Sequence, residues 1–425
     1  MRGGAPRHRD PSRWRRLAPR FGQRTDGGRW LTPKAAVGLM MAVLGVGGAI
    51  ALAPYRAGPQ AHREDLVSAP LAAAPAPFLN LIPGMPAAVA GGVYAATGPG
   101  MLAPSVADQP QYLYVPNSSP KGPGVTWVID QRTHKIVRTL QTGLLSQHVT
   151  PSYDFKVLYV EASLSGRLAT IDPATGRMTG AIATDRPYNL YFTPDGKHAI
   201  VMDEQRQKLV WSDPKTFQSQ DNVSDPSCRG PNHADFSADG RYLVVTCEFS
   251  GSLLKISTLD HQVVGRLKLP VHSKPQDVRL APDGRTFYVA DMGRDELLQI
   301  PWDDFKVAHE YRTLMMPHGI YPSRDQRFLY VSMRMSGAVQ VFDLAKQRFT
   351  STWRVPGHGT PDMGGLSADG KTLWLSGRFS GEVYGFDTAT GKLAARIKVP
   401  GRMPHGLLVW PQPGRYSLGH TGNMR

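Results

Sequence analysis

A unit of forty-odd residues recurs from about residue 105 onward, and this repeat constrains the fold more than any other feature. Residues 317–343 show it well: a short apolar strand, a polar turn, a strand rich in apolar and aromatic residues, a second turn at Gly337, and a strand that ends in Asp343. Aligned turns carry Asp154, Asp195, Asp239, Asp283, Asp325, Asp369 and, in a seventh copy, Pro413. Such a spacing with four short strands is typical of a propeller blade. The sequence therefore predicts an all-β propeller over residues 91–425.

The number of blades follows from how the ring closes. The array begins on a second strand, at Tyr112, and ends on a first strand, residues 405–410. Closure then places N-terminal and C-terminal strands in one blade, which removes open sheet edges. Seven blades is the simplest count. The alternative is eight, with residues 415–420 and 92–96 sharing an additional blade.

The strands also resemble those of the YVTN-type β-propeller repeat proteins, which are seven-bladed and extracytoplasmic in bacteria. The resemblance rests on Tyr112–Pro116, on the L-Y-V runs at residues 158–160 and 329–331, on F-Y-V-A at residues 287–290, and on the P-H-G strand starts and P-D-G turns. It implies a seven-bladed fold over residues 105–425. It does not imply one function, because this fold hosts binding, redox and other proteins.

The positive charge of the chain is concentrated at its N-terminal end. The formal net charge is +15, and residues 1–34 contribute +8 of it through ten basic and two acidic side chains. The remaining 391 residues carry +7 and are only mildly basic. Single-stranded nucleic acid is therefore a disfavoured partner, although it stays as a second alternative.

The next segment predicts a membrane anchor. Residues 35–54 are apolar and uncharged, and about 20 such residues span a bilayer core. Because the basic residues precede them, the positive-inside rule places residues 1–34 in the cytoplasm and the propeller outside. We expect a single-pass protein of the cell membrane. The alternative is a cleaved signal that leaves a secreted or periplasmic protein. The Ala/Pro-rich residues 55–90 predict a disordered linker.

Polar residues are expected at one mouth of the central channel. The start of each innermost strand and the end of the following strand lie at the same mouth, and both positions are often polar. They supply His148, His233, His318, His405, Asp277, Asp362, Glu161, Glu248, Arg334 and Arg378. Ligand sites are concave and have a few convergent polar groups. We therefore expect a monomeric propeller that acts as a scaffold and binds a protein or a small molecule at this mouth.

The histidines also suggest a metal site. Imidazole suits zinc and copper, thioethers suit Cu(I), and Met315, Met316, Met363 and Met403 accompany His233, His318 and His405 as candidate ligands. Relatives of this architecture bind copper or haem, and one is a lyase that uses a histidine and a divalent ion. A metal-dependent redox enzyme or lyase is thus the alternative function, with no catalytic residue assigned. The opposing interpretation is that P-H-G merely begins a strand, and that histidines from alternate blades need not converge to the ~2.0–2.1 Å ligand distance.

Two cysteines flank the hairpin that turns at residues 238–240. Cys228 and Cys247 lie close to opposite one another across it, so a disulfide is expected outside the cytoplasm. Closing a loop of this length contributes about 3 kcal/mol. The alternative is that both thiols join His233 in a metal site.

Overall fold

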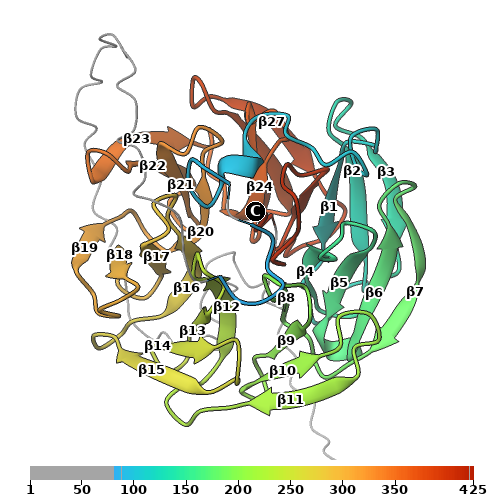
Figure 1. The fold of residues 1–425 in the computed structure, drawn as a ribbon. Helices are drawn as coiled ribbons and strands as arrows, with labels where there is room; N and C mark the ends of the chain where they lie inside the picture. Colours follow the sequence, from blue (N-terminus) through green and yellow to red (C-terminus); the bar gives the residue numbers. More distant parts are fainter. Residues whose placement is uncertain (1–80, 88, 421) are drawn as a thin grey trace, which may run out of the picture. The chain divides into compact units, whose positions relative to one another are not determined.

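Seven four-stranded antiparallel sheets form a closed ring in the computed structural model, which describes residues 81–87, 89–420 and 422–425 (Figure 1). The first four sheets, in pairing order, are β28 (Leu408–Trp410), β1 (Tyr112–Pro116), β2 (Thr126–Asp130) and β3 (Ile136–Leu140); β4 (Ser146–Pro151), β5 (Leu158–Ala162), β6 (Arg167–Asp172) and β7 (Arg177–Ala183); β8 (Asn189–Phe192), β9 (Ala199–Asp203), β10 (Lys208–Ser212) and β11 (Ser219–Val223); and β12 (Pro231–Phe236), β13 (Tyr242–Cys247), β14 (Ser252–Ser257) and β15 (Val263–Lys268).

The remaining three sheets are β16 (Pro275–Leu280), β17 (Thr286–Asp291), β18 (Glu296–Pro301) and β19 (His309–Arg312); β20 (Pro317–Pro322), β21 (Phe328–Met333), β22 (Ala338–Asp343) and β23 (Arg348–Arg354); and β24 (Pro361–Leu366), β25 (Thr372–Gly377), β26 (Glu382–Asp387) and β27 (Leu393–Lys398). Two short 3₁₀ turns complete the described elements, η1 (Ala95–Thr97) and η2 (Ser163–Ser165). The predicted all-β propeller with seven blades is confirmed.

The ring closes in the sheet that joins the two ends of the array. β28 pairs with β1, so that Tyr112 lies opposite Trp410 and Tyr114 opposite Leu408. The eight-bladed alternative is wrong. Residues 92–96 form no strand and lead into η1, while residues 415–420 form only isolated bridges and run into the channel. Neither segment has a sheet of its own because each one packs on existing blades.

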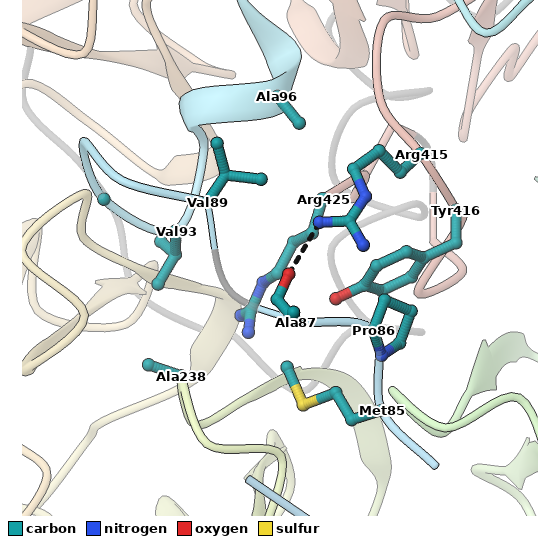
Figure 2. Close-up of a pocket in the computed structure, with 11 residues that line it drawn as sticks. Met85, Pro86, Ala87, Val89, Val93, Ala96, Ala238, Arg415, Tyr416 and Arg425 are labelled. Carbon is teal, nitrogen blue, oxygen red and sulfur yellow. Dashed lines mark hydrogen bonds between the residues drawn. The ribbon is translucent and has the colours of Figure 1, made fainter. Parts of the chain in front are cut away.

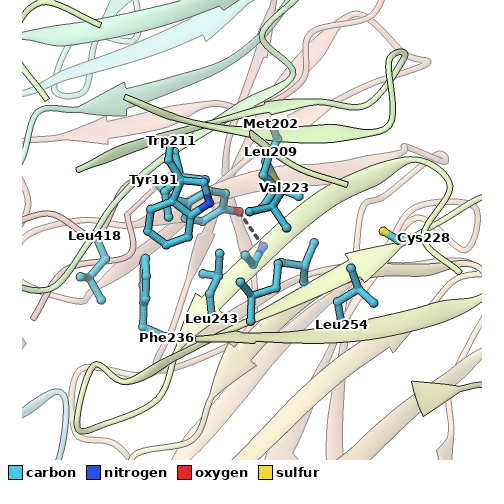
Figure 3. Close-up of a cluster of buried hydrophobic side chains, with 14 of the residues drawn as sticks. Tyr191, Met202, Leu209, Trp211, Val223, Cys228, Phe236, Leu243, Leu254 and Leu418 are labelled. Carbon is cyan, nitrogen blue, oxygen red and sulfur yellow. Dashed lines mark hydrogen bonds between the residues drawn. The ribbon is translucent and has the colours of Figure 1, made fainter. Parts of the chain in front are cut away.

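The core lies between neighbouring blades. Inner strands are buried along their whole length, whereas the outermost strands alternate or are largely exposed, as in β7. Figure 3 shows one such interface, where Tyr191 and Trp211 of one sheet meet Phe236 and Leu243 of the next. Leu418, from the C-terminal segment, packs into the same cluster. Strands packed on both faces are apolar throughout, which explains why alternation is weak in their sequences.

The channel has two ends, which we name after their connections. The turn side carries the turns that join each inner strand to its neighbour, with Asp239, Asp283 and Asp369 in them. The loop side carries the connections between blades and the hairpins that join second and third strands, such as residues 313–316 and 334–337. Each inner strand begins at the loop side. The residues predicted to gather at one mouth therefore belong to the loop side.

Segments from both ends of the described chain cover the turn side. Ile82 donates its backbone N–H to Asp239, Val93 donates to the Pro282 carbonyl, and Gly100 donates to the Ala368 carbonyl. A cavity of about 30 Å³ lies between this strip and the C-terminal segment. The Arg415 guanidinium beside it donates to the Ala87 carbonyl at 2.7 Å (Figure 2). A space of this size holds about one water. The turn side is therefore closed by the chain itself.

The predicted cytoplasmic tail, membrane anchor and first part of the linker, residues 1–80, lie outside the described residues. Within the described part of the chain, no helix combines the length and apolar character that a membrane crossing needs. The described end of the predicted linker contacts the propeller, since Ile82 is buried there.

Candidate functional site

Local bulges direct polar side chains of the inner strands into the channel. The pairing shifts register between Ser146 and Val149, and equivalent shifts follow Pro231, Pro275, Pro317 and Pro361. A bulge of this kind changes the direction of the side chains within it. The residues it contains are His148, His233, Asp277, His318 and Asp362. Each bulge therefore turns one of these groups inward.

The four predicted histidines meet at the centre of the ring. The centroid of the His148 ring lies 4.7 Å from that of His405 and 5.5 Å from that of His233. His318 lies 5.7 Å from both His233 and His405. Every one of these side chains is at most 1% exposed. Histidines from alternate blades therefore lie side by side in the channel.

A fifth histidine joins them from the C-terminal segment. His420 is fully buried, and its ring lies 4.8 Å from that of His233 and 5.4 Å from that of His148. The segment is held by hydrogen bonds from the backbone N–H of Phe192 to the Leu418 carbonyl and from that of His420 to the Leu190 carbonyl, each 3.0 Å. The sequence interpretation missed His420, although the two glycines that flank it at positions 419 and 422 signal a turn.

Several ring nitrogens lack hydrogen bonds. Nδ1 of His148 donates to the Tyr188 carbonyl at 2.8 Å, and Nδ1 of His405 donates to Asp362 at 2.7 Å. In both rings Nε2 is buried without a partner in the described structure, and so are both ring nitrogens of His233. Because burial removes the hydration of the imidazolium, it lowers the pKa of His148 to about 3 and those of His233 and His420 well below the usual value. The imidazoles are therefore neutral, and the lone pairs of His148 and His233 have no hydrogen-bond partner in the described part of the chain.

Asp362 connects the histidines to the two predicted arginines. Nε of Arg334 donates to it at 2.8 Å, and Nη1 of Arg378 lies 3.8 Å from its other carboxylate oxygen. Burial alone would raise the pKa of Asp362, but the charges of Arg334 and Arg378, together with the neighbouring His318, outweigh it and lower that pKa. Asp362 thus stays ionised in a fully buried position.

Asp277 lies on the opposite side of the cluster. One carboxylate oxygen accepts the backbone N–H of Ile320 at 2.8 Å, which ties two inner strands together. The other oxygen lies 3.4 Å from Nε2 of His420 and has no hydrogen bond in the described residues. The carboxylate of Asp277 thus lies beside Nε2 of the His420 ring.

The predicted glutamates are not in contact with the histidine rings in the described structure. Glu161 is fully buried on β5 without a hydrogen-bond partner for either oxygen, and burial raises its pKa to about 8. Glu248 accepts a hydrogen bond from Asn232 at 3.3 Å. Burial, followed by the charge of Glu248, raises the pKa of the neighbouring Glu204 to about 8. Two carboxyl groups, those of Glu204 and Glu248, therefore lie near one another at the loop-side mouth.

The methionines suggested as ligands are mostly elsewhere. Only Met363 meets a histidine among the described residues, with Sδ 2.8 Å from Nδ1 of His318. Met315 is exposed, and Met316 and Met403 are half-buried in loops. The thioethers do not gather around the cluster because the loops that carry them extend outward from the strand ends.

Cys228 and Cys247 form a disulfide, with their Cα atoms 5.1 Å apart. The bond ties the loop before β12 to the end of β13. The alternative of a metal site made of both cysteines and His233 is wrong, because a disulfide offers no thiolate.

Comparisons with known proteins identify the fold. A family model described as YNCE-like beta-propeller matches residues 152–352. Among solved structures, Kuenenia stuttgartiensis hydrazine synthase is similar with a TM-score of 0.53 and 18% identity, covering 69% of this chain and 97% of its own. A functionally unknown protein from Desulfotomaculum acetoxidans DSM 771 is similar with a TM-score of 0.60 and 14% identity, covering 70% of this chain and 98% of its own.

A third similar structure is dihydro-heme d1 dehydrogenase NirN in complex with DHE, with a TM-score of 0.53, 14% identity, and coverage of 70% of this chain and 75% of its own. No significant match was found among curated protein sequences. At these identities the structural likeness shows the fold alone. The family match and the seven blades agree with the sequence motifs, and the chain fits the YVTN-type β-propeller family.

Proposed function

We propose that this protein is an extracytoplasmic, membrane-tethered scaffold that binds an acidic partner protein on the loop side of its propeller. The apolar residues 35–54 and the basic residues before them support the tether and its orientation. The turn side is covered by the chain's own segments. The loop side surrounds the mouth of the channel and is the face left for a partner.

The observation that carries the proposal is a group of exposed apolar side chains on the loop side. They occupy blade-to-blade connections and hairpin tips around the mouth: Leu144, Leu164, Phe249, Val271, Met315, Met335 and Phe379. Val271 is 76% exposed and Phe249 is 54% exposed. Exposed apolar groups concentrated on one face mark an interaction surface. We name these seven residues the apolar rim.

The charge of the same face specifies the partner. Basic residues in its connections outnumber acidic ones by nine to five, and the two groups are Lys121, Arg186, Arg206, Arg229, Lys274, Arg294, Arg334, Arg378 and Arg402 against Asp185, Glu204, Asp225, Glu248 and Asp295. The turns of the opposite side pair their aspartates with lysines, as in Asp154–Lys156 and Asp195–Lys197. A basic surface with apolar anchors fits an acidic protein surface, because complementary charge guides association.

Two observations disfavour nucleic acid on this face. Proteins bind single-stranded nucleic acid by stacking its bases on aromatic side chains. Phe249 and Phe379 are the only aromatic members of the apolar rim. The rest of the rim is aliphatic or thioether. A protein partner uses such side chains as anchors in its own pockets.

A photocrosslinking experiment tests the docking face. The full-length protein carries p-benzoylphenylalanine at Phe249 or, as the matched control, at Leu259, which is equally exposed but lies in a turn-side hairpin. After illumination of intact cells, we expect a discrete adduct only from position 249, and mass spectrometry should identify an acidic protein. The charge reversals Arg229→Glu and Arg402→Glu should lower its yield.

Three outcomes would overturn the docking proposal. They are the absence of an adduct from position 249, an equal adduct from position 259, and an adduct with lipid or nucleic acid. The tether has its own test, because protease added to spheroplasts should digest the propeller and spare residues 1–34. A mature protein that begins after residue 54 would contradict the tether and leave the docking face untouched.

A further inference from the structure

We propose that a divalent transition-metal ion binds in the channel between His148, His233 and His420, so that the C-terminal segment completes the site. This binding site is separate from the docking face and rests on different residues. Three features support the site: the distances among the three imidazoles, the partners that their nitrogens lack, and the groups that orient the rings.

The three imidazoles have the spacing of a shared ion. Their candidate ligand atoms all lie within 4.8 Å of one another. The centre of an equilateral triangle of that side is about 2.8 Å from each corner, so movements below about 1 Å bring each nitrogen to the ~2.0–2.1 Å of a metal–imidazole bond. Rings that bind one tetrahedral ion have centroids roughly 5 Å apart by the same geometry. The observed centroid separations are 4.8, 5.4 and 5.5 Å.

Several nitrogens of these three rings have no hydrogen-bond partner among the described residues. Nε2 of His148, both nitrogens of His233 and Nε2 of His420 are buried and form no hydrogen bond in the part of the chain that the structure describes. All three side chains are 0% exposed. Buried polar atoms almost always have a partner, and their concentration in one place points to a missing ligand. One metal ion would satisfy all three rings.

Two of the rings are already oriented by neighbouring groups. The hydrogen on Nδ1 of His148 is given to the Tyr188 carbonyl, which leaves the lone pair on Nε2. His420 lies between Asn189, whose amide donates to Nδ1 at 3.1 Å, and Asp277, whose carboxylate is 3.4 Å from Nε2. Binding of an ion at Nε2 therefore requires the ring hydrogen to move to Nδ1 and the Asn189 amide to turn away. Histidine ligands of metals are usually fixed by outer contacts of this kind.

The donor set selects the class of ion. Neutral imidazoles suit zinc, copper and nickel, whereas magnesium and calcium require oxygen ligands. No thiolate is available, because the nearest cysteines form a disulfide. His405 offers a further unpartnered Nε2 beside His148 and is the candidate fourth ligand. We therefore assign the site to Zn²⁺ or Cu²⁺.

Metal analysis of the full-length protein tests the assignment. The protein is purified in detergent without a histidine tag, incubated with excess Zn²⁺ or Cu²⁺, desalted, and measured by mass spectrometry of the metal. We expect about one retained ion per chain, and a higher melting temperature with the ion that is retained. For Cu²⁺, the electron paramagnetic resonance spectrum should show coupling to several imidazole nitrogens. Retention of zinc or of copper decides which ion the site prefers.

Variants separate this site from adventitious binding. His233→Gln and His420→Gln should each lower retention at least tenfold, whereas His309→Gln, an exposed histidine on β19, should bind as the wild type does. Circular dichroism establishes that each variant is folded. If one is not, the electron paramagnetic resonance spectrum of the wild type with Cu²⁺ tests the imidazole ligands instead. The proposal is overturned if the folded wild-type protein retains neither ion. It is also overturned if His233→Gln retains as much as the wild type, or if retention depends on His309.

Discussion

The imidazole of His420 lies 4.8 Å, between ring centroids, from that of His233, although one belongs to the C-terminal segment and the other to inner strand β12. The segment therefore does more than close the turn side of the channel. It carries a polar side chain into the centre of the propeller and into contact with rings supplied by the blades. Changes in this segment should affect stability and the histidine cluster together.

Gly419→Ala should displace His420 from the channel. Gly419 has φ +99°, and an added Cβ would lie 2.3 Å from the Leu190 carbonyl oxygen, so the backbone must move away from β8. We expect a lower melting temperature and loss of the retained metal ion, measured on the same preparations. The matched control is Gly100→Ala, which has φ +71° but open space around its Cβ position, and it should keep the metal. Equal metal retention in the two variants would contradict the role given to residue 419.

Arg425→Ala should destabilise the protein by about 3 kcal/mol, because it leaves a buried carboxylate without its ion-pair partner. Arg425 donates to Asp235 at 3.1 Å and to the Phe236 carbonyl at 2.7 Å, and Asp235 is 0% exposed. Arg415→Ala, on the exposed side of the same segment, should cost less than about 1 kcal/mol. Urea unfolding followed by tryptophan fluorescence measures both. Similar losses for the two variants would show that Asp235 does not depend on Arg425.

The repeat makes the ring predictable from the sequence, but it does not predict the histidine cluster inside it. The aspartates of the turns marked six of the seven blades, and Tyr112 at the start of the array implied the closure with Trp410 that the structure contains. Convergence of the histidines depends on the bulges and on the radius of the ring, which spacing along one chain does not encode. His420 lies in a segment without the repeat, and its position depends on contacts with β8. Residues 92–96 have strand composition, but an edge to pair with is lacking once β28 closes the ring.

Replacing both Cys228 and Cys247 by Ala should lower the free energy of unfolding by about 3 kcal/mol, because the loop they close becomes free in the unfolded chain. The two residues are separated by 19 positions and are buried at the interface between two blades. Differential scanning calorimetry with and without a reductant measures the effect. The reductant should lower the melting temperature of the wild type and leave the double variant unchanged. A wild-type protein that is insensitive to complete reduction would contradict this expectation.

The stabilising contribution of Glu161 should fall as the pH rises from about 4.5 to about 8. Burial raises the pKa of this carboxyl group from 4.5 to about 8 in the folded protein. Between these values the folded state binds more protons at this position than the unfolded state, so raising the pH favours unfolding. The stabilisation of the folded state by protonated Glu161 is complete below pH 4.5 and is lost as the pH passes about 8. Glu161→Gln has no proton to lose and should show a smaller decline.

The comparison is made by urea unfolding of wild type, Glu161→Gln and Glu310→Gln at pH 5 and pH 8.5. Glu310 is exposed on β19, and its variant should follow the wild-type curve. The difference between wild type and Glu161→Gln should grow with pH, because the wild type must either bury a charge or unfold. Parallel curves for these two proteins would mean that water or a cation reaches the carboxylate and that Glu161 is ionised in the folded state.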